Sequence, residues 1–336
     1  MPRLYSSVSG LAGLLWTAAA LAQQQPVIRV DVSLVRILAT VKDGGGALVG
    51  SLERSDFEIY DNGVKQQIAV FEHHTEQPLS VALMVDTSGS TAKELKYEVD
   101  SAVRFLKALL MGGEGRDMVA LYTFNYEVMR HNNFTPNYGP LERSLKLLHA
   151  SAGTSLYDAV YLAGRDLEDR EGRKVMVIVT DGGDTTSQTK FHGAVEAAQM
   201  ADAVIYPILV MPITNDAGRN VGGENALTTL ASWTGGRVFA PSVGPALDAA
   251  FTEIIRELRT QYLLAYYPRG VPPSKDRFHR LEIKVRRPNL RVVHRNGYYG
   301  EAEGSSGSPG ARISIDPEGT TPQQIRRQQN HKQEKQ

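Results

Sequence analysis

The sequence predicts an α/β fold: a doubly wound, mostly parallel sheet with helices on both faces, together with a small β module formed by the two flanks of the chain. Two observations predict the sheet. Between residues 78 and 260, short apolar runs alternate with helical patterns, as in α/β layer folds. Two of these runs end abruptly in loops of Asp, Ser, Thr and Gly. The β module follows from a third observation, because residues 27–75 and 261–300 both carry strand-like patterns.

Length and composition narrow the class of protein. At 336 residues the chain is long enough for two domains. Lys plus Arg number 37, as do Asp plus Glu, so the formal net charge is zero. The chain has no excess of basic residues, so its charge gives no indication that nucleic acid is a partner. The lack of cysteine excludes disulfides, zinc–thiolate sites and thiol nucleophiles.

Residues 1–22 have the pattern of an export signal. Arg3 precedes an apolar segment from about Val8 to Leu21, and Ala20-Leu21-Ala22 has the A-x-A form of a cleavage site. The alternative is a transmembrane anchor, which needs about 20 strongly apolar residues, more than this segment has. We therefore expect cleavage after Ala22, export to the periplasm or the medium, and no stable membrane span in the mature chain.

The N-terminal β segment, residues 27–75, has the pattern of strands joined by turns. Phe57–Tyr60 runs into Asp61-Asn62-Gly63, a strong hairpin signal, and we expect the run Gln66–Phe71 to complete that hairpin. Earlier in the segment, apolar residues alternate with mostly polar ones at Val30, Val32, Leu34, Ile37, Ala39 and Val41. These strands are too few to bury a two-sided core, so we expect them to pack with residues 261–300.

The α/β domain, residues 78–260, begins with the apolar run Leu79–Val85, which is typical of a strand covered on both faces. A helix is expected between Thr91 and Leu110, where apolar residues share one face at Leu95, Val99, Ala102, Leu106 and Leu109. The other expected strands are Met118–Phe124, Val175–Thr180, Val204–Val210 and a short one near Val238. The other expected helices lie around Leu141–Leu148, Leu156–Leu167, Phe191–Met200 and Ala246–Leu258. One more helix is expected to end at Trp233.

The strand pattern returns in the C-terminal segment, residues 261–300. It is found at Tyr262–Tyr267, His279–Arg286 and Arg291–His294. In residues 301–336, Gly, Ser, Pro, Gln, Arg and Lys dominate and apolar residues are scarce. We expect that stretch to be a disordered tail.

Short oxygen-bearing side chains gather in three loops of the α/β domain. Asp86, Ser88 and Ser90 place hard oxygens at alternate positions directly after the first strand. Gly153-Thr154-Ser155 stands before a helix, and Asp181-Gly182-Gly183-Asp184 follows another strand. Oxygen ligands select Mg²⁺, Mn²⁺ or Ca²⁺ over zinc or copper. For any one loop alone the alternative is an ordinary turn, in which Asp, Ser and Gly are common.

Taken together, D-x-S-x-S, the Gly-Thr-Ser loop and T-D-G resemble the metal-ion-dependent adhesion site of von Willebrand factor type A domains, whose fold is Rossmann-like. The resemblance implies that Ser88 and Ser90 bind the metal directly. It implies direct or water-mediated binding by Thr154, Asp86 and Asp181, with Mg²⁺ as the cofactor and Mn²⁺ or Ca²⁺ as alternatives. Asp158 and Asp184, near a helix start, are assigned to caps or turns instead.

Motifs in the flanks extend the resemblance to a bacterial group of exported proteins related to von Willebrand factor type A domains. One is Asp56–Gly63, and the others are Tyr262–Tyr267 and Gly297-Tyr298. With the adhesion-site motif included, the likeness covers about Val27–Gly300.

These features predict an exported, non-enzymatic binding protein. With Mg²⁺ at the site, one coordination position would stay open for an acidic group, and an Asp or Glu carboxylate of a partner protein would fill it. Two alternatives stay open. One is a metal-dependent hydrolase in which the ion activates water, with Asp184 or Glu224 as candidate bases; the other is a purely structural metal.

Overall fold

The computed structural model describes residues 34–73, 77–113, 115–210, 220–242, 244–272, 274 and 277–300. The expected export signal, residues 1–22, and the expected tail, residues 301–336, lie outside the described residues. Within the described part, the strands form three sheets. No helix in that part is both long enough and apolar enough to cross a membrane.

The central sheet of the α/β domain has five strands in the order β7-β6-β5-β8-β9. Four of them run parallel, and β7 is antiparallel to its neighbour β6. The strands are β5 (Leu79–Asp86), β6 (Met118–Phe124), β7 (Val128–Thr135), β8 (Arg173–Thr180) and β9 (Ala203–Leu209). The predicted fold class, a mostly parallel α/β sheet with flanking antiparallel sheets, is therefore confirmed.

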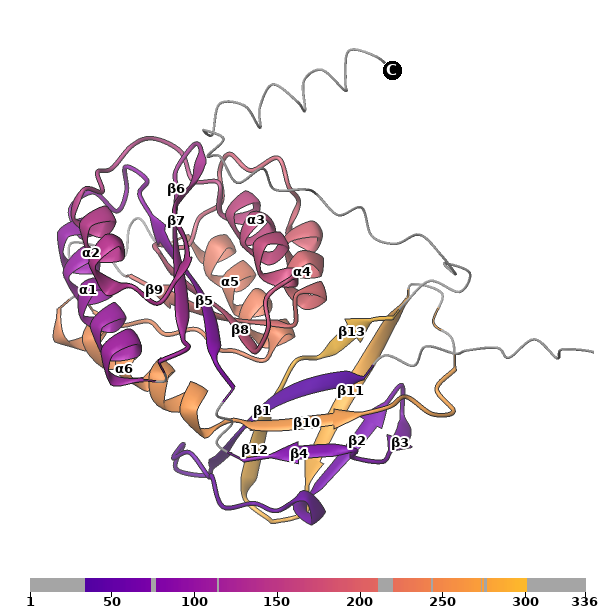
Figure 1. Cartoon of the computed structure of the whole chain (residues 1–336). Coiled ribbons are helices and arrows are strands. Elements are labelled where there is room, and N and C mark those ends of the chain that lie inside the picture. Colours follow the sequence, from indigo (N-terminus) through magenta and orange to yellow (C-terminus); the bar gives the residue numbers. More distant parts are fainter. Residues whose placement is uncertain are drawn as a thin grey trace, which may run out of the picture. The chain divides into compact units, whose positions relative to one another are not determined.

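Helices cover both faces of this sheet (Figure 1). The residues of β5 alternate between the faces: Val81, Leu83 and Val85 enter one core, whereas Ala82 and Met84 enter the other. The first core is covered by α1 (Leu95–Gly112), α2 (Tyr138–Lys146) and α6 (Pro245–Thr260). The second is covered by α3 (Leu156–Glu168), α4 (Phe191–Met200) and α5 (Val221–Thr234).

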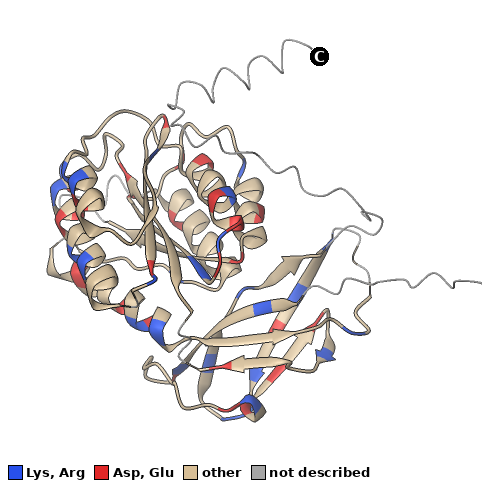
Figure 2. Ribbon diagram, viewed as in Figure 1, with Lys and Arg blue, Asp and Glu red and all other residues tan. Residues whose placement is uncertain are grey.

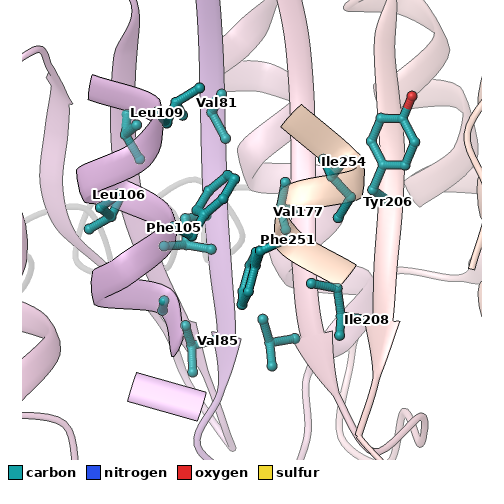
Figure 3. Packing of buried hydrophobic residues seen from close by; sticks show 14 of the residues in the cluster. Val81, Val85, Phe105, Leu106, Leu109, Val177, Tyr206, Ile208, Phe251 and Ile254 are labelled. Atoms are coloured by element: carbon teal, nitrogen blue, oxygen red, sulfur yellow. The ribbon is translucent and has the colours of Figure 1, made fainter. Parts of the chain in front are cut away.

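The core between β5, α1 and α6 fixes the strand that leads into the oxygen-rich loop. In Figure 3, Phe105 of α1 and Phe251 of α6 face each other between Val81, Val85 and the neighbouring strands. The two rings stack with centroids 4.7 Å apart. Burying each such side chain stabilises the fold by roughly 1.5–3 kcal/mol. On this face of the sheet, β5 is thus held by two packed helices, with Val85 near its carboxyl end in the same core.

The β module consists of two four-stranded antiparallel sheets, in the orders β12-β1-β10-β4 and β13-β11-β2-β3. Each sheet contains strands from both ends of the chain. They are β1 (Val35–Asp43), β2 (Phe57–Asp61), β3 (Val64–Gln66), β4 (Val70–Glu72), β10 (Tyr262–Tyr266), β11 (Phe278–Val285), β12 (Leu290–Val293) and β13 (Gly297–Tyr299). One hydrophobic cluster joins residues of both ends, such as Ile37, Ile59, Leu264 and Ile283.

Three local expectations differ from the structure. The run Gln66–Phe71 is not one strand, because β3 pairs with β2 whereas β4 pairs with β10 in the other sheet. The strand β7 was not expected, since its sequence is largely polar and its residues are half-buried or exposed at the sheet edge. The strand expected near Val238 is a single parallel bridge between Ile208 and Phe239.

A buried acidic residue joins strands from both ends of the chain within the β module. Asp61, at the end of β2, is 0% exposed. Its carboxylate accepts hydrogen bonds from the hydroxyls of Tyr266 (2.7 Å) and Tyr298 (2.8 Å) and contacts Nδ1 of His279 at 3.1 Å. Burial raises the pKa of both tyrosine hydroxyls, which therefore stay protonated and donate.

Replacing Asp61 by alanine is expected to destabilise the protein by roughly 2–5 kcal/mol, because the buried Tyr266 hydroxyl and the half-buried Tyr298 hydroxyl lose their acceptor. Denaturant unfolding of the wild type and Asp61→Ala measures the difference. The matched variant adds Tyr266→Phe and Tyr298→Phe to Asp61→Ala, and it should recover part of the loss because neither tyrosine hydroxyl is then left without an acceptor. A loss below about 0.5 kcal/mol, the range of surface substitutions, would contradict this account.

Candidate metal centre

The loop that follows β5 brings three of the predicted residues into contact. The Asp86 carboxylate is 0% exposed, and its Oδ1 accepts a hydrogen bond from the backbone N–H of Ser88 at 2.8 Å. The hydroxyl oxygens of Ser88 and Ser90 lie 2.9 Å apart. Ser88 is buried, whereas Ser90 is exposed. A buried carboxylate and two adjacent hydroxyls thus lie in one loop that opens to solvent at Ser90.

Two threonines that were not predicted as site residues hold this loop in place. Thr180, at the end of β8, donates its hydroxyl to Asp86 Oδ2 at 2.6 Å. Thr91 donates to the carbonyl oxygens of Asp86 (3.1 Å) and Ser88 (3.0 Å). Both threonines are buried. Thr180 was a foreseeable candidate, because it stands directly before Asp181 where two adjacent parallel strands end; nothing in the sequence distinguished Thr91 from a turn residue.

Thr154 reaches the same end of the sheet through its backbone. Its N–H donates to Thr185 Oγ1 at 3.0 Å, and its carbonyl accepts from the N–H groups of Thr185 (2.8 Å) and Thr186 (3.2 Å). The N–H of Ser151 donates to the carbonyl of Thr87 at 2.7 Å. These bonds connect the Gly-Thr-Ser loop to the loop after β5 on one side and to the loop after β8 on the other. The three predicted loops therefore meet.

Glycines at two of the loop positions allow this close approach. Gly153 has φ +80°, and a Cβ there would lie 3.0 Å from the Cα of Tyr126. Gly182 has φ +105°, and a Cβ there would lie 2.9 Å from the Leu209 side chain. Both dihedrals are in the region that only glycine adopts readily. The backbone geometry therefore favours glycine at both positions, directly before Thr154 and directly after Asp181.

Asp181 contributes negative charge to the site. It is partly exposed, and its charge acts on Asp86. Burial raises the pKa of the Asp86 carboxyl to about 6, the Asp181 charge acts in the same direction, and hydrogen bonds from Thr180 and Ser88 oppose the shift. A buried Asp86 carboxylate, whose ionised form the Asp181 charge disfavours further, is a suitable surrounding for a cation.

A third carboxylate, Glu98, lies in the first turn of α1 and was not predicted. It is 1% exposed, and neither of its oxygens has a hydrogen-bond partner among the residues that the structure describes. Burial raises the pKa of its carboxyl well above the usual range, and the charges of Asp86, Asp181 and Glu94 act in the same direction. In the sequence, the burial of Glu98 is indicated by its position on the apolar face of the helix, three residues after Leu95.

Elsewhere in the α/β domain, several acidic residues pair with basic ones. Asp248 pairs with Arg104 at 2.8 Å and Asp166 with Arg130 at 2.7 Å, and Figure 2 shows basic and acidic residues interspersed over the helices and strands. In the described ranges, by contrast, no ion pair involves Asp86, Asp181 or Glu98. Uncompensated acids beside two hydroxyls fit an oxygen-ligated divalent ion.

The donor set also indicates which kind of ligation is possible. No group of three or more His, Cys, Asp or Glu in the described part of the chain lies close enough to hold an ion by itself. The hydroxyls of Ser88, Ser90 and Thr154 would therefore have to supply ligands. Such a sphere of neutral oxygens leaves a bound divalent ion electron-poor and able to take an anionic ligand.

Asp158 and Asp184 are engaged in hydrogen bonds between α3 and the loop after β8. Asp184 Oδ1 accepts from the N–H of Tyr157 in the first turn of α3 (3.2 Å) and from Ser187 Oγ (2.5 Å). The Asp158 carboxylate accepts from the N–H groups of Gln188 (3.0 Å) and Thr189 (2.7 Å). Both carboxylates thus connect α3 to the loop after β8.

Comparisons with known proteins agree with this fold. Residues 81–183 match the family model of the von Willebrand factor type A domain. That match begins in β5 and ends in the loop after β8, so it spans all three oxygen-rich loops. The chain therefore has a von Willebrand factor type A-like α/β domain. No match was found among curated proteins.

Several solved structures are similar at low identity. The vWF domain of the type V pili tip protein Mfa5 from Porphyromonas gingivalis is 17% identical, with 54% of this chain and 94% of that chain covered and a TM-score of 0.45. BatB from Bacteroides thetaiotaomicron is 20% identical, with 54% and 100% covered and a TM-score of 0.42. The pilus adhesin SpaC from Lactobacillus rhamnosus GG is 10% identical, with 78% and 47% covered and a TM-score of 0.45.

Proposed function

We propose that the α/β domain is a metal-dependent binding module that captures an acidic group of a partner protein through Mg²⁺, with Mn²⁺ or Ca²⁺ as possible substitutes. Ser88, Ser90 and Thr154 would hold the ion with their hydroxyl oxygens, and Asp86 and Asp181 would balance its charge. When bound, Mg²⁺ would supply a Lewis-acidic position for an Asp or Glu carboxylate. We further propose that the protein is exported and acts in the periplasm or outside the cell.

One observation carries the proposal. Two hydroxyls 2.9 Å apart lie next to the buried Asp86 carboxylate at the carboxyl ends of parallel strands, where α/β folds bind their ligands. The hydrogen bonds from Thr180 and from the Ser88 N–H fix the Asp86 carboxylate, so that little reorganisation is needed on binding. The exposed Ser90 marks the side from which a partner can approach.

In the described part of the chain, both candidate bases of the hydrolase alternative are engaged in other interactions. The Asp184 carboxylate is engaged with Tyr157 and Ser187. Glu224 lies in the first turn of α5, where it makes interactions of its own. A cavity with Lys174, Asp202 and Ala203 in its lining lies at the start of β8 and β9, which is the opposite end of the sheet from Asp86. Binding without turnover is therefore the function that the site supports best.

Capture of acidic peptides is expected to depend on the metal. The test uses fluorescent peptides that each contain one Asp or Glu, and matched peptides with Asn or Gln in its place. We expect binding of the acidic peptides in Mg²⁺, loss in EDTA, and recovery when Mg²⁺ is restored, because the open metal position takes a carboxylate. Mass spectrometry of the recovered peptides should show no cleavage.

Equal capture in EDTA would contradict the proposal, as would equal capture of the Asn and Gln peptides. Metal-dependent cleavage of the acidic peptides would favour the hydrolase instead. Ser90→Ala offers a matched variant, since it removes one exposed hydroxyl and should weaken capture without altering the fold.

A further inference from the structure

Glu98 has no explanation in the packing of the α/β domain. It lies among the buried residues of α1, next to Val99 and one turn from Leu95 and Ala102. It is 1% exposed, and its two oxygens are without a hydrogen-bond partner in the described part of the chain. Burying an ionised carboxylate without a partner is strongly unfavourable. A glutamate at such a position therefore needs a compensating charge.

Backbone hydrogen bonds connect Glu98 to the loop that carries the serines. Thr91 accepts at its carbonyl from the N–H of Glu94 (3.0 Å), and Glu94 accepts in the same way from Glu98 (3.1 Å). The Thr91 hydroxyl in turn holds the carbonyls of Asp86 and Ser88. One continuous set of hydrogen bonds thus connects the ligand loop to the first turn of α1.

The neighbours of Glu98 show towards which site its charge acts. Besides burial, the two strongest influences on its carboxyl are the charges of Asp86 and then Asp181. These residues stand at the carboxyl ends of the neighbouring parallel strands β5 and β8. No lysine, arginine or histidine in the described ranges forms an ion pair with any of the three.

We infer that Glu98 is an outer carboxylate of the cation site, which strengthens divalent-ion binding by its buried negative charge and through water rather than as a direct ligand. Asp86, Asp181 and Glu98 cannot all be direct ligands, because no three carboxylates of the described residues lie close enough to hold one ion. The three acids Asp86, Asp181 and Glu98 carry a formal charge of −3 when ionised, and a divalent ion reduces it to −1. This inference rests on the proposed function, because it assumes the metal site.

The test uses the full-length mature chain and Mn²⁺ as the probe. Mn²⁺ affinity is measured by calorimetric titration, and the melting temperature is measured with and without Mn²⁺. Glu98→Gln keeps the size of the side chain but removes its charge. We expect at least a tenfold loss of Mn²⁺ affinity, as is typical for outer residues of metal sites, and a smaller rise of the melting temperature on adding Mn²⁺.

A purely structural role would give a different pattern. If Glu98 only filled space, Glu98→Gln would lower the melting temperature equally with and without Mn²⁺ and leave the affinity unchanged, and this outcome would overturn the inference. Asp100→Asn is the matched control, because Asp100 is an exposed acid on the same helix; it should change neither quantity.

Two further variants keep the outcome decisive. Glu98→Asp retains the charge but moves it back by one methylene, so we expect a loss of Mn²⁺ affinity of about threefold or more. This variant provides the test if Glu98→Gln does not fold. Unchanged Mn²⁺ affinity in Glu98→Asp would overturn the inference. A wild type that binds no Mn²⁺ would refute the metal site itself. A wild type that binds Mn²⁺ while Asp181→Ala does not, with Glu98→Gln unaffected, would refute the role of Glu98 alone.

Discussion

Replacing Asp181 by alanine is expected to weaken Mg²⁺ binding at least tenfold and to abolish metal-dependent capture of an acidic partner. The substitution removes a negative charge from the immediate surroundings of the proposed dication, and outer as well as direct oxygen groups influence affinity. The fold should survive, since Asp181 is a partly exposed loop residue. Calorimetric titration with Mg²⁺ or Mn²⁺ measures the loss directly.

Asp86→Ala should cost at least as much affinity, but it is a less specific change. Its carboxylate also accepts hydrogen bonds from Thr180 and from the Ser88 N–H, so alanine leaves two buried donors unpaired. Asp181 is therefore the sharper test. Asp169→Asn is the control, because it removes an exposed charge at the other end of α3. Equal affinity in the wild type and Asp181→Ala would refute the assignment of this residue.

Truncation of the chain after residue 260 is expected to unfold the N-terminal β segment while leaving the α/β domain folded. The strand β1 would lose both of its neighbours, β10 and β12, and β2 would lose β11. The core would lose residues of β10 and β11 such as Leu264 and Ile283. Ile37 and Ile59, both 0% exposed, would then face water at a cost of roughly 1.5–3 kcal/mol each.

Amide hydrogen exchange followed by mass spectrometry distinguishes the outcomes of this truncation. Residues 35–72 should exchange rapidly in the truncated chain, while the amides of β5 and β8 should stay protected. A chain truncated after Gly300 retains every described strand, so it should behave like the wild type. Slow exchange of residues 35–72 in the shorter chain would show that they fold independently and that the two flanks do not form one module.

The candidate site divides into parts that were and were not predictable. Asp86, Ser88 and Ser90 could be singled out because a buried strand ends directly before them, and the apolar run that marks this strand is local. The burial of Glu98 was indicated in the sequence only by its position on the apolar face of the helix, three residues after Leu95. Its charge is typical of an exposed helix position, and only the packed α1 shows that it lies behind the ligand loop.

The sequence by itself determined the class of fold and the three oxygen-rich loops, because the periods of strands and helices are properties of neighbouring residues. Only the tertiary structure decided which strands pair. The polar edge strand β7 and the separation of β3 from β4 depend on partners that local patterns do not specify. The joining of β1 to β10 and the hydrogen bond from Thr180 to Asp86 connect distant parts of the chain. Such contacts form only when folding brings distant parts of the chain together, so the pattern of neighbouring residues does not specify them.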